Sequence, residues 1–255
     1  MKTETASSPS CLRRALSWLL VFAVLSLGFT LAFGSLRYQW HWEAVWEYRA
    51  KFLSGWLVTV ALSLGALAGS VVLGMGAALL RRAPVLPLRQ AARVYVEAVR
   101  GTPLLVQILI LYYIVGDALG LQNRYLAGVV ILSLFGGAYV GEIVRAGIEG
   151  IGASQFETAR ALGFTTAQTY RYVVLPQALR HMLPSLAGQF VSLVKDSSLL
   201  SLIAVDEFTQ NARQVNAFTY STLEAYLPLA VGYLILTLPL SLWTQSLEKR
   251  FQYET

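Results

Sequence analysis

Long apolar segments alternate with short polar ones along most of this chain. No charged residue occurs in three of the apolar segments, which are 15–36, 52–80 and 225–247. One or two charges occur in each of three others, which are 95–116, 125–144 and 182–205. A helix that crosses a bilayer needs about 20 mostly apolar residues, and all six segments meet this requirement. The pattern therefore predicts an all-α integral membrane protein with six transmembrane helices, and the even number places both termini on one side.

Composition supports the same class of protein. Hydrophobic residues make up 56% of the chain and charged residues 13%, whereas typical soluble domains have about 45–50% and 25%. Such a chain has too few polar side chains to cover a water-soluble globule.

The basic residues are unevenly distributed between the two sides of the predicted membrane. One side has thirteen lysines and arginines in its loops, and the other has five. Because cytoplasmic loops carry an excess of these residues, the richer side, which includes both termini, is predicted to be cytoplasmic. The formal net charge of +6 is thereby explained by topology, and no nucleic-acid partner is expected.

Residues 1–51 are predicted to form a cytoplasmic tail, an extra N-terminal transmembrane helix and an outer loop. Arg13 and Arg14 precede the first apolar segment, and Ala32-Phe33-Gly34 lies near its end. Cleavable signal peptides show a similar pattern, but the uncharged run here is longer than their usual apolar core, which favours a retained helix. Whether this helix is retained or cleaved stays open.

A polar loop, residues 146–181, separates the fourth and fifth predicted transmembrane helices on the cytoplasmic side. Ser154 with Glu157, and Thr165 with Gln168, have the spacing of capping boxes, which begin helices. Gly163 lies between them, where a left-handed residue would end the first helix. We therefore expect two short helices joined at Gly163.

The end of this loop and its apolar positions refine the prediction. Pro176 either stops the second short helix or starts a new one. Phe156, Ala159 and Leu162 recur at helical spacing, so an apolar stripe is expected to contact a partner. The alternative is an amphipathic segment that lies flat on the lipid surface.

The third apolar segment contains the sequence Arg100-Gly101-Thr102-Pro103. Pro103 cannot donate a backbone hydrogen bond, so a break in the helix is expected there. Broken helices in a membrane are tolerated where they are buried in protein or line a cavity. Thr102 and Gln107 are therefore candidates for the substrate pathway, whereas Arg100 and Pro103 are given structural roles. Alternatively, the kink only improves packing.

Charged residues also occur in the fourth and fifth predicted helices. Glu142 and Arg145 are three residues apart and are predicted to form a structural ion pair. Lys195, Asp196, Ser197 and Ser198 follow one another in the next helix.

The charges of Lys195 and Asp196 are costly inside a membrane, which makes these residues functional candidates. The two side chains point about 100° apart on a helix, so each needs its own partner. Together they complement the carboxylate and ammonium groups of an amino acid, and Ser197 and Ser198 are included in this candidate pathway. Alternatively, Lys195 and Asp196 pair at a subunit interface, or with Glu142 or Arg100.

Several motifs resemble those of one transporter family. Glu157-Thr158-Ala159, Gly163, Val173 and Leu175-Pro176 resemble the EAA loop of ABC importer permeases, E-A-A-x3-G-x9-I-x-L-P, with departures at Thr158 and Val173. The segments EAVRGTPLLVQ and LVKDSSLLSL are similar to FRGTPLLVQ and L-K-D-T-S-L of the polar amino acid branch. The resemblance covers residues 52–251.

The resemblance implies the architecture and partners of a type I importer. Residues 52–251 would form its five-helix transmembrane domain, and the polar loop would be a coupling helix that fits an ATPase. The residues implied in this coupling are Phe156, Glu157, Thr158, Ala159, Leu162 and Gly163. Implied partners are two ABC ATPase subunits, a second permease subunit of the same or a different sequence, a periplasmic or lipid-anchored amino acid-binding protein, and the transported amino acid. The implied location is the bacterial cytoplasmic (inner) membrane.

The residues also exclude some chemistry. None of the four lysines follows a glycine, so the chain lacks a phosphate-binding P-loop, and ATP and Mg are expected in a partner. The chain has a single cysteine, Cys11, and its two histidines, His41 and His181, are in no metal-ligand motif. We expect a non-catalytic subunit without a cofactor. The alternatives are a secondary amino acid carrier, for which an inverted repeat would be typical, and a membrane scaffold.

Overall fold

The computed structural model describes residues 11–34 and 38–252. These residues belong to two compact units, Met1–His41 and Trp42–Thr255. The predicted cytoplasmic tail, and the end of the first apolar segment at residues 35 and 36, lie outside the described residues. Every regular element in the described parts is a helix, as the sequence predicts.

The first unit contains one helix, α1 (Cys11–Gly34). Its apolar part, Ala15–Leu31, is shorter than the transmembrane candidates of the second unit. Bulky apolar side chains such as Trp18 and Phe22 are exposed along it, as expected for a helix that contacts lipid.

The second unit has four continuous helical segments long and apolar enough to cross a membrane. They are α3 (Arg49–Leu80), α6 (Arg124–Glu149), the segment Thr166–Ile203 and α11 (Thr222–Gln252). A bent helix pair raises the number of spans among the described residues to as many as five. The predicted number of six is therefore not reached by helices of full length.

The segment Thr166–Ile203 is one helical run with three geometries. It begins as α8 (Thr166–Thr169), widens into the π-helix η2 (Tyr170–Val174), continues as α9 (Leu175–Asp196) and tightens into the 3₁₀-helix η3 (Ser197–Ile203). Pro176 lies in the first turn of α9, where a missing N–H is tolerated. Of the two roles predicted for it, the structure shows the start of a helix.

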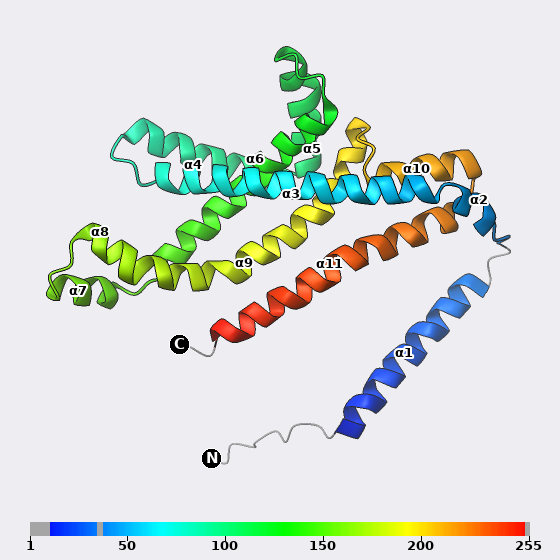
Figure 1. Cartoon of the computed structure of the whole chain (residues 1–255), viewed down its shortest axis with the longest axis horizontal. Helices are drawn as coiled ribbons and strands as arrows, with labels where there is room; N and C mark the ends of the chain where they lie inside the picture. Colours follow the sequence, from blue (N-terminus) through cyan, green and yellow to red (C-terminus); the bar gives the residue numbers. More distant parts are fainter. Residues whose placement is uncertain (1–10, 35–37, 253–255) are drawn as a thin grey trace. The chain divides into compact units, whose positions relative to one another are not determined.

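Small residues bring α3 and α6 close together. A Cβ atom added to Gly74 of α3 would lie 2.6 Å from the Cβ of Val140 in α6 and 2.8 Å from the carbonyl oxygen of Gly137. Close approach of this kind supplies the van der Waals contact that drives helix association in lipid. In Figure 1 the two helices cross near the middle of the unit, and Leu62, Ala66, Ile131 and Leu132 form part of the largest buried cluster there.

The predicted third span, 95–116, is not continuous. α4 (Leu86–Gly101) ends before Thr102. The chain then bends by 113° into a second helical run, which consists of α5 (Leu104–Ile110) and the π-helix η1 (Leu111–Gly116). Thr102 and Pro103 both have extended backbone conformations. A proline favours this conformation in the residue before it, here Thr102. The break predicted from Pro103 is thereby confirmed.

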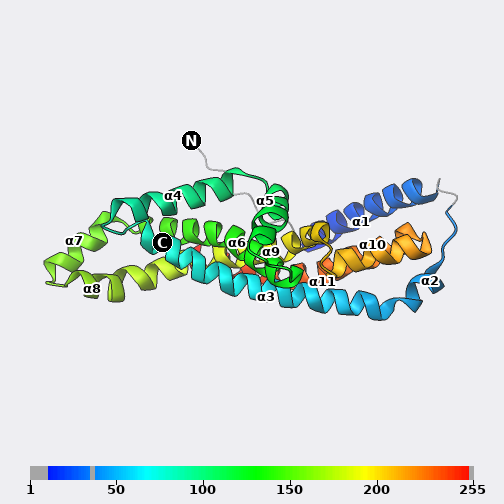
Figure 2. The same ribbon diagram turned by 90° about the horizontal axis from the view of Figure 1, so that it is seen from above.

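Two short helices each precede one of the long helices of the second unit. α2 (Trp42–Glu47) precedes α3, and α10 (Phe208–Thr219) precedes α11. Figures 1 and 2 show α10 near one end of α3, and α7 (Ala153–Ala161) and α8 near the other. The unit thus has two distinct ends, one with the hairpin of α7 and α8 and one with α10.

Candidate functional site

The hairpin is built from two helices, and only the second begins with a predicted capping box. Thr165 accepts a hydrogen bond from the backbone N–H of Gln168 (3.3 Å), and the Gln168 side chain accepts one from the N–H of Thr165 (2.8 Å), so this capping box is confirmed. The predicted box of Ser154 and Glu157 is wrong. α7 starts at Ala153 after Gly152, with no side-chain cap, so Ser154 lies within the first turn rather than before it.

Gly163 has the left-handed conformation that the sequence predicts, with φ of +78°. Its N–H donates to the carbonyl of Arg160 (2.9 Å), and the N–H of Phe164 donates to the carbonyl of Ala159 (3.0 Å). These two bonds form a Schellman motif. The turn between the helices is therefore fixed by backbone hydrogen bonds.

The predicted apolar stripe does not lie on one face. Ala159 is 2% exposed and half-buried Phe156 packs edge-on against the ring of Tyr170 at 6.3 Å, whereas Leu162 is 70% exposed. Phe156 and Ala159 thus hold the hairpin together, and Leu162 points away from it.

The free face of the hairpin includes two aromatic residues that sequence reasoning missed. Phe164 and Tyr172 lie with their rings 6.4 Å apart, and both are exposed. Glu157, Thr158 and Gly163 are exposed as well. The surface available to a partner therefore combines these residues with Leu162. Phe164 was missed because the turn, rather than a helical period, places it there.

The hairpin is joined to the transmembrane helices by a buried cluster. Val144 of α6, Val174 of η2 and Ala178 of α9 are buried in it, and Phe156 and Tyr170 pack against it. The side chain of Arg82, just after α3, also donates a hydrogen bond to the Tyr170 hydroxyl (3.2 Å). Because packed interiors transmit displacement, a force on the hairpin would reach three transmembrane helices.

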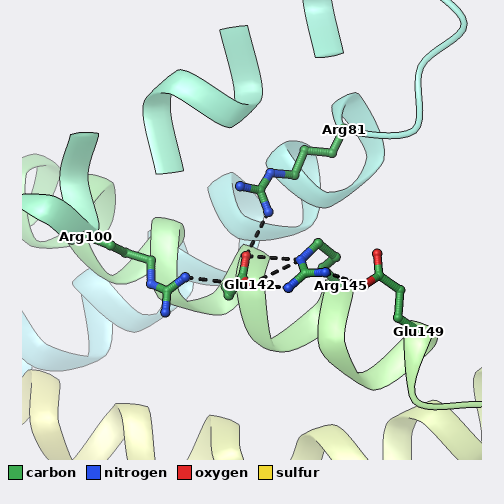
Figure 3. Close-up of polar contacts among 5 residues, drawn as sticks. All are labelled: Arg81, Arg100, Glu142, Arg145 and Glu149. Carbon is green, nitrogen blue, oxygen red and sulfur yellow. Dashed lines mark hydrogen bonds and ion pairs between the residues drawn. The ribbon is translucent and has the colours of Figure 1, made fainter. Parts of the chain in front are cut away.

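A charged cluster lies where the ends of α3 and α4 meet α6, with Glu142 at its centre (Figure 3). Glu142 pairs with Arg145, as predicted, and also with Arg81 (2.7 Å) and Arg100 (3.6 Å). Arg145 in addition pairs with Glu149. One carboxylate therefore joins the ends of α3, α4 and α6. Arg81 was missed because nothing local in the sequence relates it to Glu142.

Lys195 and Asp196 are not part of this cluster. Lys195 is exposed and Asp196 half-buried at the end of α9, and neither forms an ion pair with any residue in 11–34 or 38–252. The alternative in which they pair with Glu142 or Arg100 is therefore wrong within this chain. The hydroxyls of Ser197 and Ser198 donate to the carbonyls of Val194 and Lys195, each at 2.7 Å, and Ser197 is fully buried.

The side chains of Thr102 and Gln107 donate hydrogen bonds to backbone carbonyls at the break between α4 and α5. The Gln107 amide donates to the carbonyls of Val99 (2.7 Å) and Thr102 (3.0 Å), and the Thr102 hydroxyl donates to the carbonyl of Ala98 (2.8 Å). These bonds satisfy carbonyls that the break leaves without helical partners. Arg100 lies over the ring of Tyr139 at 5.5 Å.

A buried carboxylate at the α10 end was also missed. Glu207 is fully buried and accepts hydrogen bonds from the N–H groups of Thr209 (2.8 Å) and Gln210 (2.7 Å) and from the Tyr233 hydroxyl (3.0 Å). Burial raises the pKa of the Glu207 carboxyl, against the lowering effect of these donors. Glu207 is the N-cap of α10, and it was missed because this helix was not predicted from the sequence.

Comparisons with known proteins agree with this geometry. The sequence profile of the family described as binding-protein-dependent transport system inner membrane component matches residues 70–253. The chain is 37% identical over 204 residues to the probable glutamine ABC transporter permease protein GlnM of Bacillus subtilis, across 80% of this chain and 94% of that protein. It is 35% identical over 216 residues to the glutamine transport system permease protein GlnP of Escherichia coli, across 84% and 99%.

A solved structure extends the comparison to three dimensions. The crystal structure of an amino acid ABC transporter with histidines superposes with a TM-score of 0.78 and 34% identity, across 84% of this chain and 100% of that one. The residues that the family profile matches, 70–253, include those of the hairpin, the broken helix pair and the charged cluster. The chain therefore belongs to the family of binding-protein-dependent transport system inner membrane components, the multi-pass, non-catalytic permease subunits of ABC importers.

Proposed function

We propose that this permease subunit moves polar amino acids across the bacterial cytoplasmic membrane by alternating access. Two similar proteins are named as glutamine permeases, and the similar solved transporter is described with histidines. The RGTPLLVQ and KDSS segments of this chain support the same substrate class. The particular amino acid stays open.

The coupling role rests on one observation, the construction of the hairpin. Its turn is fixed by the Schellman motif at Gly163, and its second helix by the capping box of Thr165. Exposed Leu162, Phe164 and Tyr172 supply an apolar surface that a partner would bury. Such a rigid element, packed against three transmembrane helices, suits the transfer of motion from an ATPase.

The proposed assembly contains two ATPase subunits, a second permease subunit and an amino acid-binding protein outside the membrane. ATP and Mg would bind the ATPase subunits, whose closure would bring the two hairpins together. In this arrangement the hairpin and both termini are cytoplasmic. Residues 52–251 would form the five-helix domain and residues 1–51 would add α1 as a sixth transmembrane helix.

Lys195 and Asp196 are proposed to contact the amino acid. Both side chains lie where α9 tightens into η3, and neither is neutralised by an ion pair within the described chain. Thr102 and Gln107 would shape the pathway at the nearby break in the third span.

Reconstitution tests this function. The chain would be placed in proteoliposomes with its ATPase and binding protein, and amino acids would be screened for stimulated ATP hydrolysis and for uptake. We expect both signals with a polar amino acid, and loss of uptake in Lys195→Met. Uptake that follows an ion gradient without the ATPase would instead indicate a secondary carrier. Assembly without any substrate-dependent hydrolysis would indicate a scaffold.

A further inference from the structure

A cavity of about 370 Å³ lies between the end of α3, the helix α4 and the end of α6. We name it the arginine pocket, because five arginines line it, namely Arg81, Arg82, Arg93, Arg100 and Arg145. Three glutamates, Glu97, Glu142 and Glu149, also line it. The lining therefore carries two more positive than negative charges.

Two of the five arginines are not engaged in the ion pairs of the pocket. Glu142 is shared by three arginines, and Glu149 pairs with Arg145. Arg82 donates to the neutral hydroxyl of Tyr170, and Arg93 forms no ion pair within 11–34 or 38–252. Two guanidinium groups can thus turn to a ligand without breaking an existing ion pair.

Arg81 adds a second, independent observation. Its side chain is 12% exposed, and its Nε is buried without a hydrogen-bond acceptor among the described residues. A buried donor that lacks an acceptor lowers stability. Figure 3 shows the Arg81 guanidinium held by Glu142 on one side only, so Arg81, which lines the pocket, retains donor capacity for a further acceptor.

We propose that the arginine pocket binds a phosphate group, supplied by an anionic phospholipid headgroup or by a soluble phosphate compound. Planar guanidinium groups suit phosphate oxygens because they donate two parallel hydrogen bonds. A phosphate would neutralise the excess positive charge of the lining.

The surroundings favour a lipid as the source. Leu86, Leu88 and Val94 of α4 are exposed apolar residues on the helix that carries Arg93 and Arg100. A helix with an exposed apolar surface and basic residues is typical of the membrane interface, where headgroup phosphates lie. The bound group would also lie close to the hairpin, since Arg82 contacts Tyr170.

The test uses the permease purified with its ATPase. Its midpoint of thermal unfolding would be measured in nanodiscs of phosphatidylcholine, in nanodiscs that also contain phosphatidylglycerol, and in detergent with inorganic phosphate. We expect phosphatidylglycerol to raise the midpoint of the wild type. The double variant Arg82→Gln/Arg93→Gln should need at least about tenfold more of this lipid for the same shift. Arg89→Gln is the matched control, because Arg89 is on α4 but does not line the pocket.

Each outcome has a defined meaning. A shift with inorganic phosphate that the double variant loses would identify a soluble source. Equal shifts in the wild type and the double variant would overturn the proposal, as would an equal loss in Arg89→Gln, which would indicate general surface charge. Should the double variant fail to elute as a single complex, Arg93→Gln alone answers the question, because Arg93 takes part in no ion pair that the structure describes.

Discussion

The guanidinium of Arg82 donates a hydrogen bond of 3.2 Å to the hydroxyl of Tyr170, which connects the end of α3 to the hairpin. The bond is exposed, so its contribution to stability is at most about 1 kcal/mol. Its position gives it a different importance, since Tyr170 also packs against Phe156 inside the hairpin. This contact lies where motion of the hairpin would enter the transmembrane helices.

Removing the Tyr170 hydroxyl should weaken coupling more than folding. In Tyr170→Phe the ring still packs against Phe156, whereas the bond to Arg82 is lost. We expect an unchanged unfolding midpoint and a several-fold smaller stimulation of ATP hydrolysis by the loaded binding protein. The control is Tyr113→Phe, because Tyr113 lies on η1 and outside the hairpin. Equal stimulation in all three proteins would show that the bond plays no part.

Changing Gly163 should disrupt the hairpin turn. Proline fixes φ near −65° and lacks the N–H that Gly163 donates to Arg160, so Gly163→Pro cannot keep the observed φ of +78°. The variant should insert into the membrane and show only basal ATPase activity. Gly152→Ala serves as the control, because Gly152 has a φ of −59° that alanine adopts freely. Normal stimulation of Gly163→Pro would contradict the coupling role.

Neutralising Glu142 should destabilise the second unit. Glu142→Gln leaves Arg81, Arg100 and Arg145 close together without their shared carboxylate. The carboxylate is 21% exposed, so we expect a loss of about 1–3 kcal/mol, seen as a lower midpoint of thermal unfolding. Glu149→Gln should have a smaller effect, since Glu149 is 53% exposed and, among the described residues, forms an ion pair with one arginine, Arg145. Equal losses would mean that the sharing by three arginines is unimportant.

Stability should depend on pH through Glu207. Because burial raises the pKa of this carboxyl in the folded state, the folded protein holds the proton more tightly than the unfolded chain, whose glutamate pKa is about 4.3. This contribution is therefore complete below about pH 4.3 and is lost as pH rises through the folded-state pKa. Glu207→Gln removes the titrating group and should flatten the dependence, although its single oxygen can accept from only one of the N–H groups of Thr209 and Gln210, which bond to different oxygens of Glu207. Thermal unfolding of both proteins at several pH values, with Asp206→Asn as control, would measure it.

Much of the fold follows from local sequence. Long uncharged runs identified α3 and α11, because length and hydrophobicity alone decide a transmembrane helix. Pro103 identified the break in the third span, and Gly163 and Thr165 identified the turn of the hairpin. Each of these features depends on one residue or one run.

Features that depend on contacts between distant segments could not be predicted. Arg81 meets Glu142 only after α3 has packed on α6, and no spacing in the sequence relates the two. No helix was predicted from the sequence for the segment that contains α10, because this segment lacks an apolar run. It is a helix because Phe208 and Val215 are buried against residues of α3 and α11. The Ser154 cap failed for a simpler reason, since Gly152 begins the helix earlier.

The uninterrupted helical run from Thr166 to Ile203 has a mechanical consequence. Tyr170, near the proposed contact with the ATPase, and Lys195, at the proposed substrate position, are separated by about 38 Å along this run. A displacement imposed at one end would be passed to the other along this run, through the π-helix η2 and past Pro184 inside α9. In the proposed function, ATP hydrolysis and release of the amino acid would then depend on one movement of this helical run.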